Sequence, residues 1–253
     1  MIKVRWLNTD PLIASARLRS LIPAQHLADR VTLGNDVIIA AKHGWNAHLI
    51  RKHAKRMIMD VCDDHFDNKH GPHYLTACQL ADVVTCNSKT MQQIIKDRTG
   101  RDSIVIDDPY EDPELKPTSG KGLLWFGHHT NLPALQAIAD RIKYPTAVVS
   151  SHNYDKLDSW LKACRAVIIP TDHRKAKSAN RAIRAIRYGK YPVCGDLPAY
   201  AEIGLGKGDF WRDLDYAMTQ DTTNEVLSLQ RAIRDRFSPE KVSADWWKVI
   251  NEA

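Results

Sequence analysis

Short apolar runs rich in β-branched residues alternate with segments of helical periodicity along the whole 253-residue sequence. This alternation is typical of βαβ units, in which helices connect the strands of a mainly parallel sheet. We expect strands at 2–7, 36–41, 56–61, 82–86, 103–106, 122–126, 146–149, 166–169 and 192–194. We expect helices at 15–27, 46–54, 72–80, 88–97, 131–142, 154–163, 178–188 and 225–236, and a last one that carries Trp246, Trp247 and Ile250. The fold class is therefore α/β.

The alternation stops at residues 107–120, which contain three prolines and five acidic residues. Such a segment continues neither a helix nor a sheet, so we place a domain linker there. The sequence thus predicts a domain at 1–115, a second at 120–237, and a C-terminal helix at 238–253 that packs back on the first domain. Two small Rossmann-like doubly wound domains would leave a cleft between them, at the carboxyl ends of their strands, where such folds bind ligands.

The composition bears on the kind of partner and on the cellular compartment. The net charge of +6 and a pI near 9.0 favour a phosphate-bearing or polyanionic partner. The five cysteines are odd in number and form no C-x-x-C pair, which favours a reducing cytoplasm over disulfides or a thiolate zinc site. We expect no signal peptide and no membrane span, because the sequence has no uncharged apolar run of about 18 residues.

The most informative segment is 169–204, where a buried strand ends, a basic loop follows and a helix begins near Ser178. Free N–H groups and the helix dipole at such a start attract anions. Lys177, Ser178 and Asn180 would add a cation, a hydroxyl and an amide, which together suit a diphosphate. The alternative is that Ser178 only caps the helix and the lysines are solvated.

This segment resembles the donor-binding half of GT-B glycosyltransferases, as found in families 1 and 4. The resemblance is carried by KSANR at 177–181, GKYPV at 189–193 and PAYAE at 198–202. Other pieces agree in order and spacing: SARLR at 15–19, PA at 23–24, DVII at 36–39, MDVCDD at 59–64, ADVVTCNS at 81–88 and LWFG at 124–127.

The resemblance implies transfer of a hexose from a nucleotide diphosphate donor, most simply a UDP-sugar, without a metal or a tightly bound cofactor. The donor would be held by Gly127, His128, Asn131, Lys177, Ser178, Asn180 and Arg181. Arg184 stands where many retaining members carry a glutamate that holds the ribose, and Glu202 is a candidate substitute.

An inverting enzyme of this kind needs a general base for the acceptor hydroxyl. Asp64 is the first candidate, followed by His65 and Asp63, because these residues directly follow a predicted buried strand. They could instead cap the next turn. The run from Asp63 to His73 also contains carboxylates and imidazoles that suit a metal, but its spacing fits no metal motif, and a histidine-rich loop is the alternative.

Basic residues are more numerous than one diphosphate requires. Those that could contact a nucleic-acid backbone include Arg17, Arg19, Arg51, Lys52, Arg174 and Lys175. Together with the pI they motivate a specific hypothesis: the acceptor is a 5-hydroxymethylated pyrimidine in double-stranded DNA, as in phage DNA modification, reached by base flipping. The alternatives are a solvated positive face, a transferase acting on a polysaccharide, lipid or protein, and a non-catalytic nucleotide- or DNA-binding module.

Overall fold

The computed structural model describes residues 1–41, 46–151, 154–171, 176, 178–206 and 208–252. It divides into two compact units. Unit 1 consists of residues 1–111 and 236–253, and unit 2 of residues 112–235. The division falls inside the segment where the sequence predicts a linker, and Arg236 and Phe237 belong to unit 1 rather than to the second domain.

Unit 1 is built on a parallel sheet of six strands in the order β2-β1-β3-β4-β5-β6. Its strands are β1 (Ile2–Trp6), β2 (Val31–Leu33), β3 (Val37–Ala41), β4 (Arg56–Val61), β5 (Val83–Cys86) and β6 (Ile104–Val105). Side chains alternate between the two faces of a strand. Val37, Ile38 and Ile39 of β3 are all buried, so both faces of this sheet are covered.

The first helical segment of unit 1 is α1 (Ala14–Ala16), the π-helix η1 (Arg17–Leu21) and α2 (Ile22–His26) in succession. The others are α3 (Ala47–His53), α4 (Gly71–Leu80), α5 (Lys89–Thr99) and α12 (Pro239–Asn251). Ser88 caps α5 by accepting the N–H of Met91, as the sequence pattern predicts.

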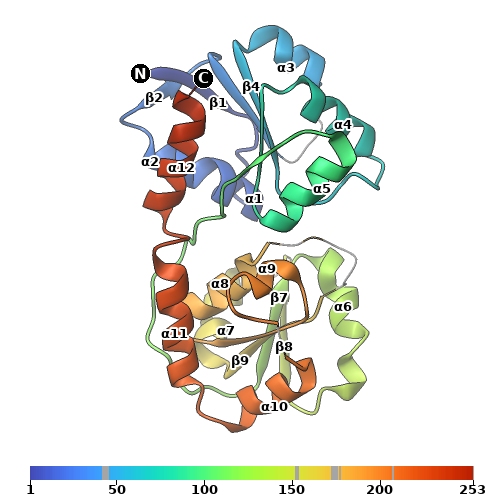
Figure 1. Ribbon diagram of the computed structural model, residues 1–253. Coiled ribbons are helices and arrows are strands. Elements are labelled where there is room, and N and C mark those ends of the chain that lie inside the picture. Colours follow the sequence, from blue (N-terminus) through green and yellow to red (C-terminus); the bar gives the residue numbers. More distant parts are fainter. Residues whose placement is uncertain (42–45, 152–153, 172–175, 177, 207, 253) are drawn as a thin grey trace. The chain divides into compact units, whose positions relative to one another are not determined.

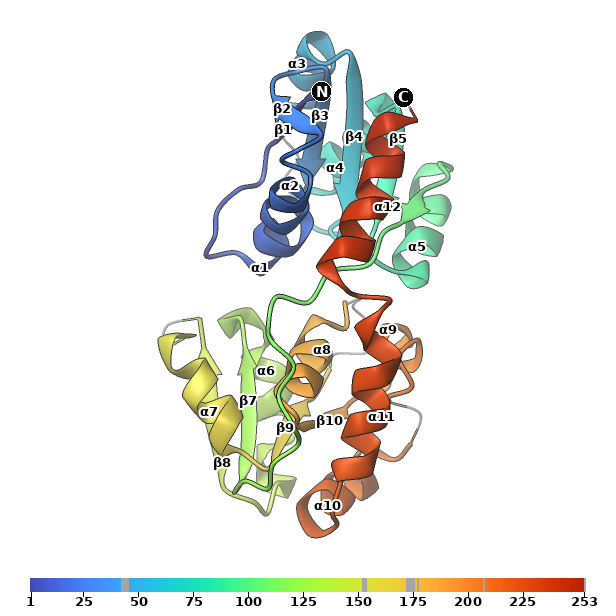
Figure 2. The same cartoon turned by 90° about the vertical axis from the view of Figure 1, so that its left-hand side faces the viewer.

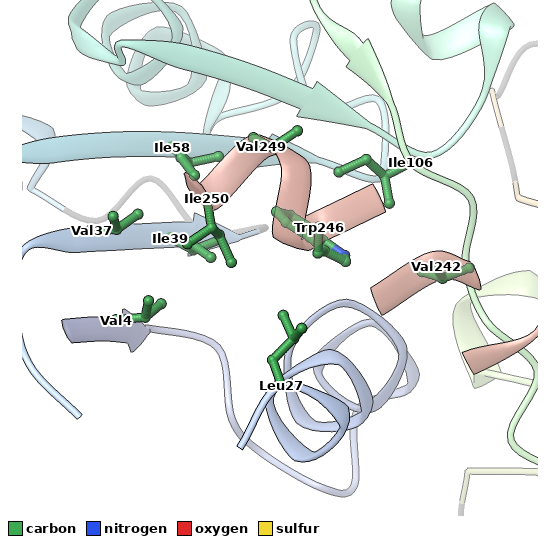
Figure 3. Packing of buried hydrophobic residues seen from close by; sticks show 10 residues of the cluster. All are labelled: Val4, Leu27, Val37, Ile39, Ile58, Ile106, Val242, Trp246, Val249 and Ile250. Atoms are coloured by element: carbon green, nitrogen blue, oxygen red, sulfur yellow. The ribbon is translucent and has the colours of Figure 1, made fainter. Parts of the chain in front are cut away.

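The C-terminal helix α12 lies beside α2 and covers one face of the unit 1 sheet (Figures 1 and 2). Figure 3 shows Trp246, Val249 and Ile250 of this helix packed with strand residues such as Ile39 and Ile58. Trp246 is fully buried and meets Trp6 edge to face, with ring centroids 5.1 Å apart. The core of unit 1 therefore includes the last helix of the chain.

Unit 2 contains a parallel sheet of four strands in the order β10-β9-β7-β8. Its strands are β7 (Leu123–Gly127), β8 (Thr146–Ser150), β9 (Ala166–Ile169) and β10 (Tyr191–Cys194). Its helices are α6 (Leu132–Gln136), α7 (Leu157–Ala163), α8 (Asn180–Arg187), α9 (Pro198–Ala201), α10 (Phe210–Thr219) and α11 (Thr223–Arg234), with short 3-10 turns at His129–Asn131, Ala139–Arg141 and Tyr154–Lys156. Trp125 and Ile168 share a core cluster with Leu135 of α6 and Leu214 of α10.

Residues 107–121, all described by the structure, contain no helix or strand, in agreement with the sequence prediction. From Asp112 onward this segment is bound to unit 2. The N–H of Leu115 donates to the carbonyl of Arg187 (2.7 Å) and that of Lys121 to the carbonyl of Ala163 (3.0 Å). Gly189 lies close to this segment and has a positive φ of +69°. A Cβ at this position would lie 2.5 Å from the Lys116 carbonyl oxygen. Glycine is required there on both grounds.

Several elements differ from the sequence prediction. The predicted helix at 131–142 ends at Gln136, although Leu132, Ile138 and Ile142 still pack against the core beside Leu135. The predicted helix at 178–188 begins at Asn180, with Ala179 at its N-cap, so Ser178 lies one residue too early to cap it. Strand β2 and helices α9 and α10 have no counterpart in the prediction.

Candidate functional site

The order of the strands fixes where a ligand can bind in unit 2. From β7 the chain adds β8 on one side, then returns to add β9 and β10 on the other. In open α/β sheets, ligands bind at such a switch point, outside the carboxyl ends of the two diverging strands. Here these ends are Gly127 and Ile169, so the loops that follow β7 and β9 flank the candidate site.

The cationic side chain of Arg181 lies at the carboxyl end of β7, beside this switch point. This residue lies in the first turn of α8, and its Nη1 donates to the carbonyl oxygen of Phe126 at 3.4 Å. A Cβ added to Gly127 would lie 3.4 Å from the same nitrogen, at van der Waals contact. The guanidinium therefore lies directly against the end of β7. The side chain of Arg181 is half-buried.

The start of α8 supplies further anion-binding groups. No side chain of the N-cap residue Ala179 accepts a helix N–H, and the first turn contains no acidic residue. The N–H groups and the positive end of the helix dipole can therefore serve a ligand. Ser178 and Asn180 are half-buried beside this start. Lys177, Arg174 and Lys175 lie outside the described residues.

The loop after β7 places two imidazoles at the same strand end. His128 Nδ1 lies 2.9 Å from Thr130 Oγ1, and the rings of His128 and His129 are in contact, with centroids 4.0 Å apart and planes tilted by 38°. Asn131 follows at the end of the 3-10 turn and is half-buried. The structure thus brings Gly127 and Arg181 together, with His128 and Asn131 in the loop that leaves the same strand.

The charge of Arg181 affects the pKa of two buried residues in unit 2, Tyr200 and Cys194. Burial raises the pKa of the Tyr200 hydroxyl to about 12, and the Arg181 cation acts against this rise. The thiol pKa of Cys194 is also raised by burial and lowered by Arg181. Glu202 directly follows α9 and is half-buried. Tyr200 and Cys194 are therefore neutral at physiological pH and do not neutralise the Arg181 cation.

Seven basic residues lie between Arg174 and Lys190 in the sequence, and three of those that the structure describes are used within unit 2. Arg184 pairs with Asp112 at 3.0 Å and with Asp158 at 3.4 Å, and Arg187 pairs with Glu114 at 2.8 Å. Lys190 is fully buried and donates to Thr118 Oγ1 (2.9 Å), the Thr118 carbonyl (3.3 Å) and the Lys162 carbonyl (3.0 Å). Charge alone would let all seven contact a nucleic-acid backbone, but Arg187 and Lys190 do not serve such a surface, because they bind residues 112–118.

In unit 1 the three candidate base residues lie in the loop after β4. Asp64 Oδ1 accepts the N–H of Phe66 at 3.2 Å, which is a turn-capping contact. Asp63 Oδ2 lies 4.0 Å from His65 Nε2, and both side chains are about a quarter exposed. The His65 ring meets Tyr74 of α4 edge to face at 5.3 Å.

Arg19 is not a surface residue, and its assignment to a nucleic-acid contact is corrected. It is fully buried and pairs with Asp60 (2.5 Å) and Asp108 (3.3 Å). Arg17 and Arg51 are also paired, with Glu111 (2.7 Å) and Asp82 (2.7 Å), whereas Lys52 is exposed on α3. The sequence analysis assigned no role to Asp60, Asn68 or Tyr74. Asp60 lies within the MDVCDD run, and Asn68 lies within DNKHGP, whose composition predicts a turn.

The described residues contain no group of three histidine, cysteine or acidic side chains arranged to hold a metal ion. They also contain no helix whose length and apolar character would let it cross a bilayer.

The architecture defines the class of fold: an α/β protein of the GT-B type with two parallel sheets. Solved structures show the likeness. A TarM variant from S. aureus, in complex with fondaparinux, alpha-GlcNAc-glycerol and UDP, aligns with a TM-score of 0.62 at 9% identity, over 90% of this chain and 58% of that one. AviGT4, a glycosyltransferase involved in avilamycin A biosynthesis, aligns with a TM-score of 0.57 at 10% identity, over 100% of this chain and 99% of that one.

A second TarM structure aligns with a TM-score of 0.60 at 10% identity, over 90% of this chain and 57% of that one. The chain thus spans less than three fifths of the TarM chains and nearly all of AviGT4. No protein-family model matches the sequence, and no curated protein matches it.

Proposed function

We propose that this protein is a glycosyltransferase that transfers a hexose from a UDP-sugar to an acceptor hydroxyl. The observation that carries the proposal is the position of Arg181 beside Gly127, at the switch point of unit 2 and in the first turn of a helix whose N-cap side chain accepts no helix N–H. A guanidinium and the N–H groups of a helix start stabilise the negative charge that develops on a leaving diphosphate. The GT-B fold and the UDP in the TarM complex support this choice of ligand.

The donor site would consist of Gly127, His128, Asn131, Ser178, Asn180 and Arg181, with Lys177 and Glu202 as further candidates. The base for the acceptor hydroxyl would come from the loop of Asp63, Asp64 and His65 in unit 1. In the transfer step the acceptor oxygen bonds to the anomeric carbon, the bond from that carbon to the diphosphate breaks, and the base takes the hydroxyl proton. No metal is needed in this scheme.

The test is binding of UDP-glucose, UDP and uridine, followed by the release of UDP in the presence of acceptors. A ligand of the native state present at 100 times its Kd raises the free energy of unfolding by about 2.7 kcal/mol. UDP and UDP-glucose should raise the melting temperature and uridine should not, because uridine has no diphosphate. Equal effects of UDP and uridine, or none from any of the three, would reject the donor site.

For the acceptor, we propose 5-hydroxymethylated pyrimidines in DNA as the first class to test. The net charge of +6 and the exposed Lys52 support it, whereas the buried Arg19, Arg187 and Lys190 contribute nothing to it. Binding of modified duplex DNA should weaken steeply as salt increases. If duplex DNA fails to bind at low salt, the acceptor belongs to another class of hydroxyl compound, such as a polysaccharide, lipid or protein.

A further inference from the structure

Strand β1 presents two basic side chains to solvent on one face of the unit 1 sheet. Its residues Ile2, Val4 and Trp6 pack with the core cluster to which α12 contributes. Side chains alternate between the two faces of a strand, so Lys3 and Arg5 lie on the face away from α12. Both side chains are exposed.

Helix α3 lies on this same face. The β1–α2–β2 and β3–α3–β4 connections run in opposite directions along the sheet. Because such connections are right-handed, they place α2 and α3 on opposite faces. Helix α12 lies beside α2, so α3 shares the face of Lys3 and Arg5 (Figure 1).

The outer side of α3 combines an apolar side chain with a cation. Ala47 and Ile50 are buried, whereas Leu49 is 53% exposed. Lys52 follows Leu49 by three residues, so the two side chains are neighbours on the helix surface, and Lys52 is exposed as well. An apolar residue beside basic ones is typical of a helix that lies at a membrane interface.

The acidic residues that meet α3 and its following turn are already paired. Residues 37–59 contain no aspartate or glutamate. Arg51 pairs with Asp82 at 2.7 Å, and Lys55 pairs with Asp36 at 2.8 Å. Neither pair therefore adds net charge to this side of unit 1.

Lys3, Arg5 and Lys52 give this side a positive charge. The pKa of Asp36 is lowered first by its hydrogen bond with Lys55 and also by Lys3, so two cations share this one carboxylate. Within the described part of the chain, Arg5 and Lys52 form no ion pair. Three positive charges therefore remain on this face.

We propose that Lys3, Arg5, Leu49 and Lys52 form a docking surface for an anionic lipid bilayer. The three charges are complementary to lipid phosphate groups, and Leu49 enters the boundary between headgroups and acyl chains. A nucleic-acid backbone would attract the cations but would leave Leu49 in water.

The docking surface is separate from the candidate base loop. Lys3 lies near the amino end of β1, and Lys52 lies in the last turn of α3, which leads to the amino end of β4. The loop of residues 63–65 follows the carboxyl end of β4, at the opposite end of the sheet. The inference therefore goes beyond the proposed transfer reaction and does not depend on it.

Sedimentation of the full chain with lipid vesicles tests the role of the charges. Vesicles that contain phosphatidylglycerol beside phosphatidylcholine should bind the protein at low salt and release it at high salt, because salt screens the attraction. Vesicles of phosphatidylcholine alone should not bind it. Each basic residue near an anionic bilayer strengthens binding roughly fivefold, so Arg5→Gln/Lys52→Gln should bind roughly 25-fold more weakly. Lys241→Gln/Lys248→Gln, with both side chains exposed on α12, is the matched control and should bind as the wild type does.

Leu49→Ala isolates the apolar contribution. It should lower the affinity for the anionic vesicles about tenfold, because fewer methyl and methylene groups leave water. Leu227→Ala, at a 38% exposed position on α11, is the control and should change nothing.

Three results would overturn the proposal: equal binding of the two kinds of vesicle, equal binding of Arg5→Gln/Lys52→Gln and the wild type, or unchanged binding in Leu49→Ala. In the last case, weaker binding of duplex DNA by Arg5→Gln/Lys52→Gln would assign the surface to nucleic acid instead. No sugar nucleotide enters these measurements, so their outcome is distinct from that of the donor site.

Discussion

The guanidinium of Arg19 meets the carboxylate of Asp60 through two parallel contacts, Nε to Oδ2 at 3.0 Å and Nη2 to Oδ1 at 2.5 Å. Both side chains are fully buried. Asp60 also accepts from Thr85 Oγ1 (2.8 Å), and Arg19 also donates to the carbonyl of Ile106 and to Asp108. This network joins the π-helix, β4 and the start of the 107–121 segment.

Arg19→Ala should destabilise unit 1 by about 3–5 kcal/mol, because it leaves Asp60 and Asp108 buried without their cation. Urea unfolding followed by tryptophan fluorescence measures the change. Arg51→Ala is the matched control: it breaks an exposed pair with Asp82 and should cost at most about 1 kcal/mol. Equal losses in the two variants would contradict the role assigned to the buried network.

Arg181→Ala should weaken UDP binding roughly 10- to 100-fold, because hydrogen bonds to a charged group contribute about 1.5–3 kcal/mol each. Isothermal titration calorimetry with UDP measures the affinity of the variant and of the wild type. Arg231→Ala, exposed on α11, should leave the affinity unchanged. Unchanged affinity in Arg181→Ala would move the diphosphate away from the switch point.

The sequence predicted those elements whose signal is local. Strands β4 and β9 occupy the predicted residues because runs such as AVII are apolar and rich in β-branched residues, and AVII is bounded by Arg165 and Pro170. Strand β2 escaped prediction because it has three residues at a sheet edge, with Leu33 82% exposed, so no buried pattern marks it.

Long-range pairing could not be predicted. Arg19 was expected on the surface because it lies in a helical segment with other basic residues, but its partners are 41 and 89 positions away. The approach of Arg181 to Gly127 likewise depends on β9 lying beside β7, which the order of elements along the sequence does not determine. The loops of the candidate site were predictable, and the contacts within them were not.

Stability should fall at alkaline pH because of the buried thiols. Burial raises the pKa of Cys164 from 9.0 to about 11 and that of Cys78 to about 12. Below pH 9 each thiol is protonated in both states and the stabilisation is complete. Above pH 9 only the unfolded chain releases these protons, so the free energy of unfolding declines by about 1.4 kcal/mol per pH unit for each thiol.

Urea unfolding between pH 7 and 10.5 measures this decline. Cys164→Ala should remove one thiol from it, so the variant should lose stability less steeply than the wild type between pH 9 and 10.5. Lys190, whose pKa is lowered by burial, acts in the opposite sense and interacts electrostatically with Cys164, so its contribution does not cancel in the difference. Cys78→Ala, whose thiol pKa has no contribution from Lys190, gives the same test without it. Parallel pH profiles of variant and wild type would show that Cys164 ionises equally in both states.

Trp246→Ala tests whether the last helix is part of the core of unit 1. The side chain is fully buried, meets the Trp6 ring edge to face and lies under the guanidinium of Arg19 at 5.1 Å. Removing a buried tryptophan costs about 3–5 kcal/mol, so urea unfolding should shift by that amount. Trp247→Ala should cost less, because that ring is only half-buried. If the two variants lose stability equally, α12 is held by its backbone contacts, such as the bond from Arg56 Nη1 to the carbonyl of Val249 at 2.6 Å, rather than by the Trp246 ring.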